Sequence, residues 1–188
     1  MTATLSKLLN AMGLVAIDTV LVLAFTDQLW YRDLPCGICI LQRAGFIAAG
    51  FGIALNLVFG PRASHYGLAI LGALAGAMIS ADQILLYIVP GSGSYGNDVF
   101  GLHLYTWALI AFVLIVVGSA FMLLFDHQFD PSAPLPERLT VLPVMSVALL
   151  GVLAVANIFS TLAICGWGIS CPETPGGYII FNENLGLT

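Results

Sequence analysis

Five apolar stretches run along the chain, and short polar segments separate them. A helix that crosses a bilayer needs about 20 predominantly apolar residues. The stretches cover residues 8–25, 40–59, 66–89, 104–125 and 140–164. Turn-forming sequences such as "GPR" and "PGSGSYGND" follow the second and the third. The pattern predicts an all-α membrane protein, with residues 1–164 as one transmembrane helical domain and residues 165–188 as a polar tail.

Composition supports the same class. Hydrophobic residues make up 60% of the chain and charged residues 8%, whereas soluble domains carry about 25% charge. The net charge of -5, without a basic patch, excludes a nucleic-acid-binding protein. No small-residue cleavage motif follows the first stretch, and Asp18 lies within it, so we expect a retained helix rather than a signal peptide.

The basic residues suggest an orientation for the five helices. Lys7, Arg62 and Arg138 fall on one side of the membrane, and Arg32 and Arg43 fall on the other. Basic residues favour the cytoplasmic side, and Trp and Tyr favour the interfaces. The aromatic residues that map to the opposite side are Trp30, Tyr31, Tyr87, Tyr95, Tyr105, Trp107 and Trp167. We therefore expect a cytoplasmic N-terminus and a C-terminus on the other face.

All four cysteines map to that non-cytoplasmic face. Cys36 and Cys39 lie between the first two stretches, and Cys165 and Cys171 follow the fifth. One crossing precedes the first pair and five precede the second, so four crossings separate them and both pairs lie on the same side, where disulfides persist in an oxidising compartment. The sequence predicts two disulfide pairs at one face.

The segment "LPCGICILQRAG" combines two cysteines with an arginine. If Pro35 begins a helix, Cys36, Cys39 and Arg43 share one of its faces. An arginine about 6 Å from a thiolate stabilises it by about 2 to 3 kcal/mol at an effective dielectric constant of about 20. We expect Arg43 to favour the Cys39 thiolate; the alternative is an arginine that extends to the interface.

A tight Cys-x-x-Cys disulfide suits thiol exchange better than structural bracing. A purely structural disulfide and a four-cysteine zinc site are the alternatives, and the oxidising compartment argues against zinc. Ile40 instead of His follows Cys39, which excludes a haem attachment motif, and no flavin or nicotinamide fingerprint is present. A lipid-soluble electron acceptor remains.

The residues "PCGICILQR" resemble the Pro-Cys-x-x-Cys-x-x-(Glu/Gln)-Arg signature of the DsbB family, and "FGLHLYTWALI" is similar to the start of that family's fourth helix. The resemblance covers about residues 8–125. It implies a protein of the bacterial inner membrane that reoxidises a periplasmic DsbA-type thiol oxidase and passes the electrons to ubiquinone or menaquinone. It also implies that Cys36 and Cys39 are the quinone-coupled pair, and that Cys39, Gln42 and Arg43 contact the quinone.

The second cysteine pair departs from the family pattern. The family usually carries it between the third and fourth helices, where this chain has a short connection without cysteine. Here a fifth helix delivers Cys165 and Cys171 instead. We expect the periplasmic partner to attack Cys171, beside the turn-rich "PETPGG", and Cys165 to pass electrons inward; the alternative is a structural clasp.

Other polar residues within or beside the stretches have two interpretations each. His103 could donate a proton to reduced quinone or simply lie at the interface. Asp18 and Asp82 are functional candidates or partners in interhelical hydrogen bonds. The pair Gly72 and Gly76 indicates close helix packing.

The predicted function is that of a membrane thiol:quinone oxidoreductase that makes disulfides for a soluble thioredoxin-like partner. One alternative is a vitamin-K epoxide reductase type of enzyme, although there the quinone-facing Cys-x-x-Cys comes late in the chain. The other is a non-catalytic membrane subunit with two structural disulfides.

Overall fold

The computed structural model describes residues 3–89, 91, 93–96, 98–129, 141–167, 171 and 177–179. Its elements are α1 (Ala3–Trp30), α2 (Gly37–Phe59), α3 (Ala63–Leu86), β1 (Asp98–Val99), β2 (Leu102–His103), α4 (Leu104–Leu123), the 3-10 helix η1 (Asp126–Phe129) and α5 (Val141–Cys165). All five α-helices are long and apolar enough to cross a membrane. The predicted fold class, an all-α membrane protein with a bundle of five transmembrane helices, is confirmed.

The helix ends differ from the predicted spans most clearly in α1. This helix extends five residues beyond residues 8–25 at each end. The added turns carry polar side chains that are buried and paired with other parts of the bundle: Ser6 donates to Gln128 at 2.8 Å, and Gln28 donates to Ser160 at 2.9 Å. An apolar window therefore underestimates the helix. The predicted linker after α4, with Arg138, lies outside the described residues.

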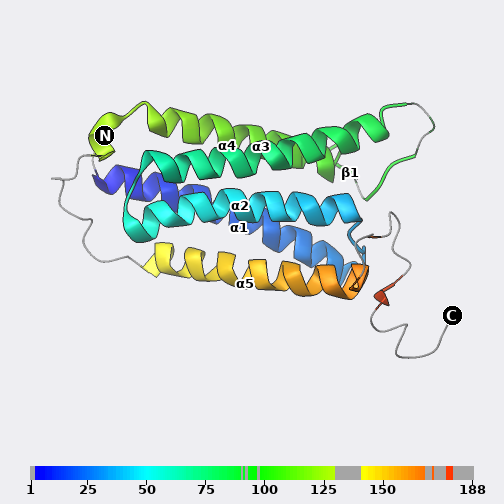
Figure 1. Cartoon of the computed structure of the whole chain (residues 1–188). Coiled ribbons are helices and arrows are strands. Elements are labelled where there is room, and N and C mark those ends of the chain that lie inside the picture. The colour runs from blue at the N-terminus through cyan, green and yellow to red at the C-terminus, as the bar shows by residue number, and fades with distance from the viewer. Residues whose placement is uncertain are drawn as a thin grey trace.

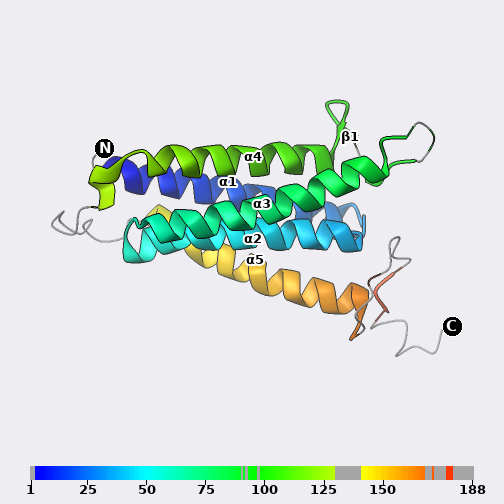
Figure 2. The same ribbon diagram turned by 45° about the horizontal axis from the view of Figure 1, so that its top comes forward.

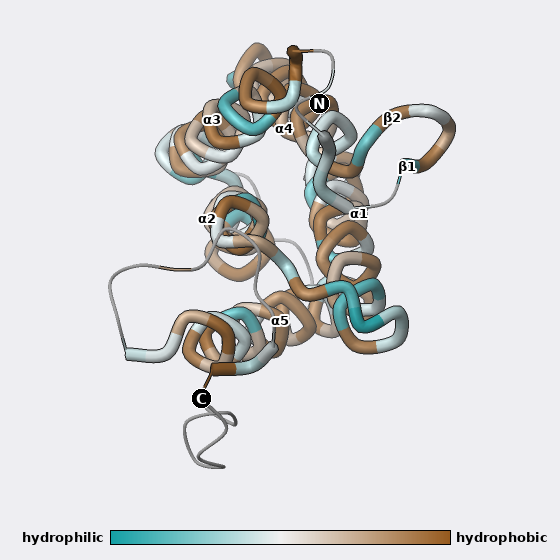
Figure 3. Tube along the Cα trace, turned by 90° about the vertical axis from the view of Figure 1, so that its right-hand side faces the viewer, coloured by the Kyte–Doolittle hydropathy of each residue, from teal (hydrophilic) through white to brown (hydrophobic). Residues whose placement is uncertain are grey.

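The central helix of the bundle is α2, which contacts each of the other four α-helices. Figure 1 shows the helices lying side by side along one direction, and Figure 3 looks along them, with α3 and α4 above α2, α1 to its right and α5 below. In Figure 3, hydrophobic residues occur along the length of every α-helix. Figure 2 shows α5 inclined away from α2 towards the end that carries Cys165. The central position of α2 places its first turn between α1, α3 and α5.

Glycines bring α2 and α3 into close contact. A Cβ atom on Gly45 would lie 2.8 Å from the Cα atom of Gly76, and one on Gly72 would lie 2.6 Å from the backbone nitrogen of Ala49. Small residues at such crossings let helix backbones approach inside a membrane, where packing and not the exclusion of water drives association. The expected role of Gly72 and Gly76 in helix packing is confirmed.

Replacing Gly76 with alanine should destabilise the bundle by about 1 to 3 kcal/mol, because overpacking costs this much in a tight core. The new methyl group would overlap the ring of Phe112, which is fully buried and stacks on Phe46 with ring centroids 3.9 Å apart. Thermal unfolding in detergent measures the loss. Gly118→Ala is the matched control, since among the described residues nothing beyond the local helix backbone lies within 4 Å of the added methyl; equal melting temperatures for the two variants would contradict the packing argument.

Two polar contacts join α5 to α1. Ser146 donates a hydrogen bond of 2.6 Å to the Asp18 carboxylate, and Gln28 pairs with Ser160 near the other end of α5. Polar groups inside a membrane protein need such internal partners. Asp18 therefore serves as an interhelical contact, the second of its two expected roles, whereas Asp82 is exposed on the surface of α3.

A polar cluster closes the end of the bundle opposite the cysteines. Asn10 donates to Tyr66 at 2.7 Å, and Asn56 donates to Asn10 at 3.1 Å. Tyr66 also donates to Gln128, which follows α4. These contacts connect α1, α2 and α3 with η1. The polar side chains of this cluster therefore hydrogen-bond to one another and hold these elements together.

Candidate functional site at the cysteine-bearing end

Both cysteine pairs lie at one end of the bundle, where α1, α3 and α5 end and α2 and α4 begin (Figure 1). They form the disulfides Cys36–Cys39 and Cys165–Cys171, so no cysteine is free. The predicted grouping and pairing of the cysteines are confirmed. Within the described residues, no group of three or more His, Cys, Asp or Glu side chains could hold a metal ion.

The first disulfide spans the start of α2. Cys36 is the N-cap residue, and its sulfur accepts a hydrogen bond of 3.1 Å from the backbone nitrogen of Cys39. The prediction that Pro35 occupies the first helical turn is wrong, because the capping sulfur of Cys36 leaves Pro35 outside the helix. Cys39 lies in the first turn, where unpaired N–H groups and the helix dipole stabilise a negative charge.

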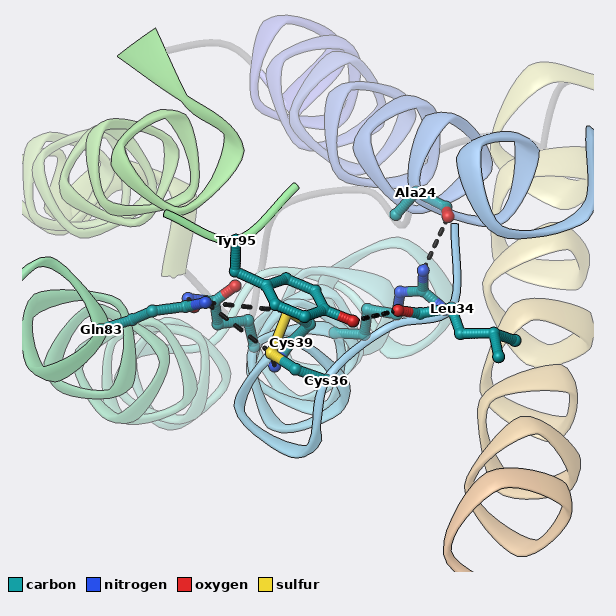
Figure 4. Close-up of a disulfide and its surroundings, with 8 residues drawn as sticks. Ala24, Leu34, Cys36, Cys39, Gln83 and Tyr95 are labelled. Carbon is teal, nitrogen blue, oxygen red and sulfur yellow. Dashed lines mark hydrogen bonds between the residues drawn. A yellow bond between two sulfur atoms is a disulfide. The ribbon is translucent and has the colours of Figure 1, made fainter. Parts of the chain in front are cut away.

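Gln83, in the last turns of α3, contacts both sulfurs of this disulfide. Its Nε2 atom lies 3.7 Å from the sulfur of Cys36 and 3.9 Å from that of Cys39, as Figure 4 shows. Gln42 donates to the Oε1 atom of Gln83 at 2.9 Å, which turns the amide nitrogen of Gln83 towards the sulfurs. Gln83 is only 1% exposed. Sequence reasoning selected its exposed neighbour Asp82 and missed Gln83.

Replacing Gln83 with leucine should make the Cys39 thiolate less reactive, because a hydrogen bond to a charged group is worth about 1.5 to 3 kcal/mol and a long one to sulfur less. In a Cys36→Ala background, we expect alkylation of Cys39 at neutral pH to slow by about tenfold, which corresponds to about 1.4 kcal/mol. Leu86→Met, at an exposed position on the same helix, is the control. Equal alkylation rates with glutamine and leucine at position 83 would show that Gln83 does not stabilise the Cys39 thiolate.

The arginine of the motif points from α2 to α1. Arg43 is only 7% exposed; it donates to the Gln28 side chain at 2.6 Å and to the Ala24 carbonyl at 2.7 Å. Its guanidinium carbon also lies 4.7 Å from the ring centroid of Phe25. A buried arginine with three contacts is held in place, so the alternative of an arginine extended to the interface does not describe it. The stabilisation of the Cys39 thiolate by Arg43 stays a prediction.

A cavity of about 710 Å³ opens beside this site between α1, α2 and α4. Cys39, Gln42, Arg43 and Gln83 contribute to its wall, while most of the remaining wall is apolar. A second cavity of about 370 Å³ shares Val20, Phe46 and Ala111 with it and extends towards the opposite end of the bundle. The two cavities therefore adjoin along these shared residues.

The connection between α3 and α4 lies over the first disulfide. Tyr95 from this connection donates a hydrogen bond to the carbonyl oxygen of Leu34, and Figure 4 shows its ring beside Cys36 and Cys39. Burial raises the pKa of the Tyr95 hydroxyl above its usual value, with smaller contributions from Asp33 and Tyr87. The hydroxyl therefore stays protonated and remains a donor at physiological pH.

His103 is at the entrance to α4 and not among the residues that line the cavity. Its ring stacks on Tyr105 with centroids 5.2 Å apart, and its Nδ1 atom is buried without a hydrogen-bond partner among the described residues. Tyr105 does line the cavity. Cys39, Gln42 and Arg43 share the cavity wall, and a role of His103 towards a bound quinone stays a prediction.

The second disulfide reaches the first turn of α2. Gly166, directly after α5, has a φ of 65°, a left-handed conformation that suits glycine. A Cβ atom built on Gly37 would lie 3.2 Å from the Cβ atom of Cys171. Cys171 therefore packs against the residue that follows Cys36. Most of the predicted polar tail, including "PETPG", lies outside the described residues.

Comparison with known proteins finds a family that is similar to the first three helices. The sequence model of the family described as "Disulfide bond formation protein DsbB" matches residues 6–94, a little under half of the chain. No curated protein and no solved structure matches. The matched segment contains α1, α2 and α3 with the Cys36–Cys39 disulfide, and it ends before α4 and α5.

The matched residues include most of the candidate site. They supply the capped Cys-x-x-Cys disulfide, Arg43 and Gln83 at the wall of a cavity within a bundle of membrane-spanning helices. The second disulfide, on the added helix, lies beside them. Residues 6–94 are thus similar to the DsbB family of disulfide bond formation proteins, and the five apolar helices make the chain a multi-pass membrane protein.

Proposed function

We propose that the protein is a thiol:quinone oxidoreductase that reoxidises a periplasmic, thioredoxin-like dithiol oxidase of the DsbA type. One observation carries the proposal: Cys39 of the Cys36–Cys39 disulfide lines a large, mostly apolar cavity at the cysteine-bearing end of the bundle, together with Arg43. A disulfide whose sulfur adjoins such a cavity can exchange electrons with a lipid-soluble acceptor.

The residues of the cavity fit a quinone. A quinone has a polar ring that accepts hydrogen bonds and an apolar tail, and the cavity has donors near Cys39 and apolar walls beyond them. The Arg43 guanidinium and the Gln42 amide are the donors nearest in sequence to Cys39, and Val20 and Phe46 line the apolar part. A bound quinone would accept two electrons and two protons, for which ubiquinone and menaquinone both serve.

The protein's own residues prepare the reactive sulfur. When the Cys36–Cys39 disulfide is reduced, the start of α2 and the amide of Gln83 stabilise negative charge on Cys39. The buried Arg43 adds a positive charge one helical turn further on. Apolar residues such as Phe46 keep water away from the cavity, so these electrostatic effects are stronger than in solution.

The second disulfide receives the electrons from the partner. A thiolate of the reduced partner attacks the Cys165–Cys171 disulfide, and the released thiols then reduce Cys36–Cys39. A DsbA-type oxidase is a strong oxidant with a potential of about −120 mV, so an ordinary thiol pool cannot reoxidise it, whereas a quinone can. A periplasmic partner requires both disulfides to face the bacterial periplasm. With five membrane-spanning helices, the N-terminus then lies in the cytoplasm.

The direct test uses the purified protein with a reduced DsbA-type dithiol and a soluble quinone. We expect both to be consumed in a ratio of one dithiol to one quinone, because each transfer moves two electrons. Dithiol oxidation without loss of quinone would indicate another acceptor. A protein that consumes neither would be a membrane subunit braced by its two disulfides.

The orientation has a separate test in intact cells. After mild reduction, a membrane-impermeant thiol reagent added outside spheroplasts should label Cys165 and Cys171, since the proposed periplasmic face carries both. Lys7→Cys, in a background without the four native cysteines, is the control for the cytoplasmic end and should be labelled only after lysis. Labelling of Cys165 and Cys171 only after lysis would reverse the orientation and remove the periplasmic partner.

A further inference from the structure

The Cys36–Cys39 disulfide is covered on several sides. Cys36 is only 4% exposed, and on the α3 side the amide nitrogen of Gln83 lies 3.7 Å from its sulfur. A Cβ atom on Gly37 would lie 3.2 Å from the Cβ atom of Cys171, so the chain after α5 covers the adjacent turn of α2. The connection between α3 and α4 covers a further side. The access of a soluble thiol to this disulfide therefore depends on that connection.

Tyr95 is the residue of the connection that turns towards the bundle. Among residues 93–96 it is half-buried, whereas Gly93, Ser94 and Gly96 are exposed. Gly93 has a φ of 85° and Gly96 a φ of 75°, the left-handed conformation that suits glycine. The chain can thus turn on either side of Tyr95, and these turns direct its ring inward.

A hydrogen bond fixes the Tyr95 ring beside the disulfide. The hydroxyl donates to the carbonyl oxygen of Leu34, two residues before Cys36. Tyr95 and Cys39 contribute to the wall of the same cavity, and Figure 4 shows the ring next to both sulfur-bearing residues. The ring therefore occupies space that a thiol from the aqueous phase would need to reach either sulfur.

The second disulfide has less cover. Cys165 and Cys171 are both partly exposed, whereas Cys36 is buried. Trp167, which follows Cys165 by two residues, is 89% exposed and does not shield it. The rate of thiol–disulfide exchange depends on access to the sulfur that is attacked. The two disulfides should thus differ in their reactivity towards soluble thiols.

We propose that Tyr95 determines which thiols can reduce the protein, because its ring blocks direct attack on Cys36–Cys39 and leaves Cys165–Cys171 as the entry point. The proposal rests on the proposed function and names the residue that restricts its substrates. Without the ring, two small thiols would give up two electrons and two protons at Cys36–Cys39 and become one disulfide. The acceptor would then be consumed by the general thiol pool instead of by the partner.

The first experiment measures direct attack without any quinone. Cys165→Ser with Cys171→Ser leaves Cys36–Cys39 as the only disulfide, and dithiothreitol reduces it as the reagent itself closes to a cyclic disulfide. With Tyr95→Ala added, we expect reduction to be at least about tenfold faster, because access controls the rate. Tyr95→Phe keeps the ring but loses the hydrogen bond, and should accelerate reduction by about two- to tenfold. The exposed Trp167→Ala is the control and should change nothing.

The second experiment keeps the second disulfide, in case the multiple variant folds poorly. In a Cys36→Ala background, Cys39 is alkylated either by iodoacetate, which stays in water, or by N-ethylmaleimide, which also dissolves in lipid and can enter through the apolar cavity. Tyr95→Ala should accelerate the iodoacetate reaction by about tenfold and leave the maleimide reaction within about twofold. A change in the reactivity of the thiolate itself would instead accelerate both reactions equally.

Two results would overturn the proposal: equal rates of dithiothreitol reduction with tyrosine and alanine at position 95, or equal acceleration of both alkylation reactions. The failure of the proposed function is distinguishable, because neither experiment contains an acceptor. A disulfide that Tyr95 shields in a protein unable to reduce quinone would keep the shield and discard the acceptor.

Discussion

Replacing Cys39 with alanine should abolish quinone reduction, lowering the rate by at least about 10³-fold, as loss of a reacting nucleophile does elsewhere. Cys39 is the member of the first pair that lines the cavity, so its sulfur is the one placed to react with an acceptor held there. The measurement is quinone consumption by the purified variant with excess reduced dithiol. Turnover near the wild-type rate would remove Cys39 from the electron path.

The matched variant Cys36→Ala separates the two sulfurs. It keeps Cys39 with its helix end, its Gln83 contact and its cavity. We expect no turnover, because the disulfide cannot re-form, but a visible absorption band on addition of quinone, from charge transfer between the Cys39 thiolate and the quinone. Cys39→Ala should lack the band. A band of equal strength in both variants would assign the absorbance to another part of the protein.

The fold was predictable because the membrane restricts it. Apolar stretches of about 20 residues have few alternatives to helices in a bilayer. Parity alone then brings the four cysteines to one end, as the structure has them. The helix ends were less predictable, because Ser6 and Gln28 are polar residues that stay helical only through partners distant in the sequence.

The site was predictable only where its residues are close in sequence. Cys36, Cys39, Gln42 and Arg43 lie within two turns of one helix, and the spacing of the motif places them together. Gln83 reaches the disulfide from α3, and its position depends on the glycine-mediated register between α2 and α3. No periodicity within α3 distinguishes Gln83 from Asp82 as a site residue.

The partners of Arg43 were missed for a related reason. Its hydrogen bonds go to Ala24 and Gln28, and Gln28 lies beyond the end of the predicted first span. Gln28 also contacts Ser160 on α5 and Tyr178. The Gln28 side chain thereby connects Arg43 on α2 with Ser160 on α5. This link depends on how α1 and α5 pack, and neither sequence segment reveals it alone.

Replacing Arg43 with glutamine should slow quinone reduction by about 30- to 150-fold, which corresponds to the loss of about 2 to 3 kcal/mol of thiolate stabilisation. The charge should matter more than the volume, because the guanidinium is buried and the cavity beside it is mostly apolar. The thiolate itself can be followed by its ultraviolet absorbance in a Cys36→Ala background. We expect a smaller thiolate fraction at neutral pH with glutamine at position 43.

A second variant distinguishes charge from positioning. Gln28→Leu removes the 2.6 Å partner of Arg43 and the contact with Ser160 but keeps the positive charge. If Arg43 acts on Cys39 through its charge, Gln28→Leu should retain most of the thiolate fraction, whereas Arg43→Gln should not. An equal loss in both variants would mean that Arg43 serves mainly to hold α1 and α5 against α2. The effect on Cys39 would then follow from the packing of three helices and not from the electrostatic attraction between two residues one turn apart.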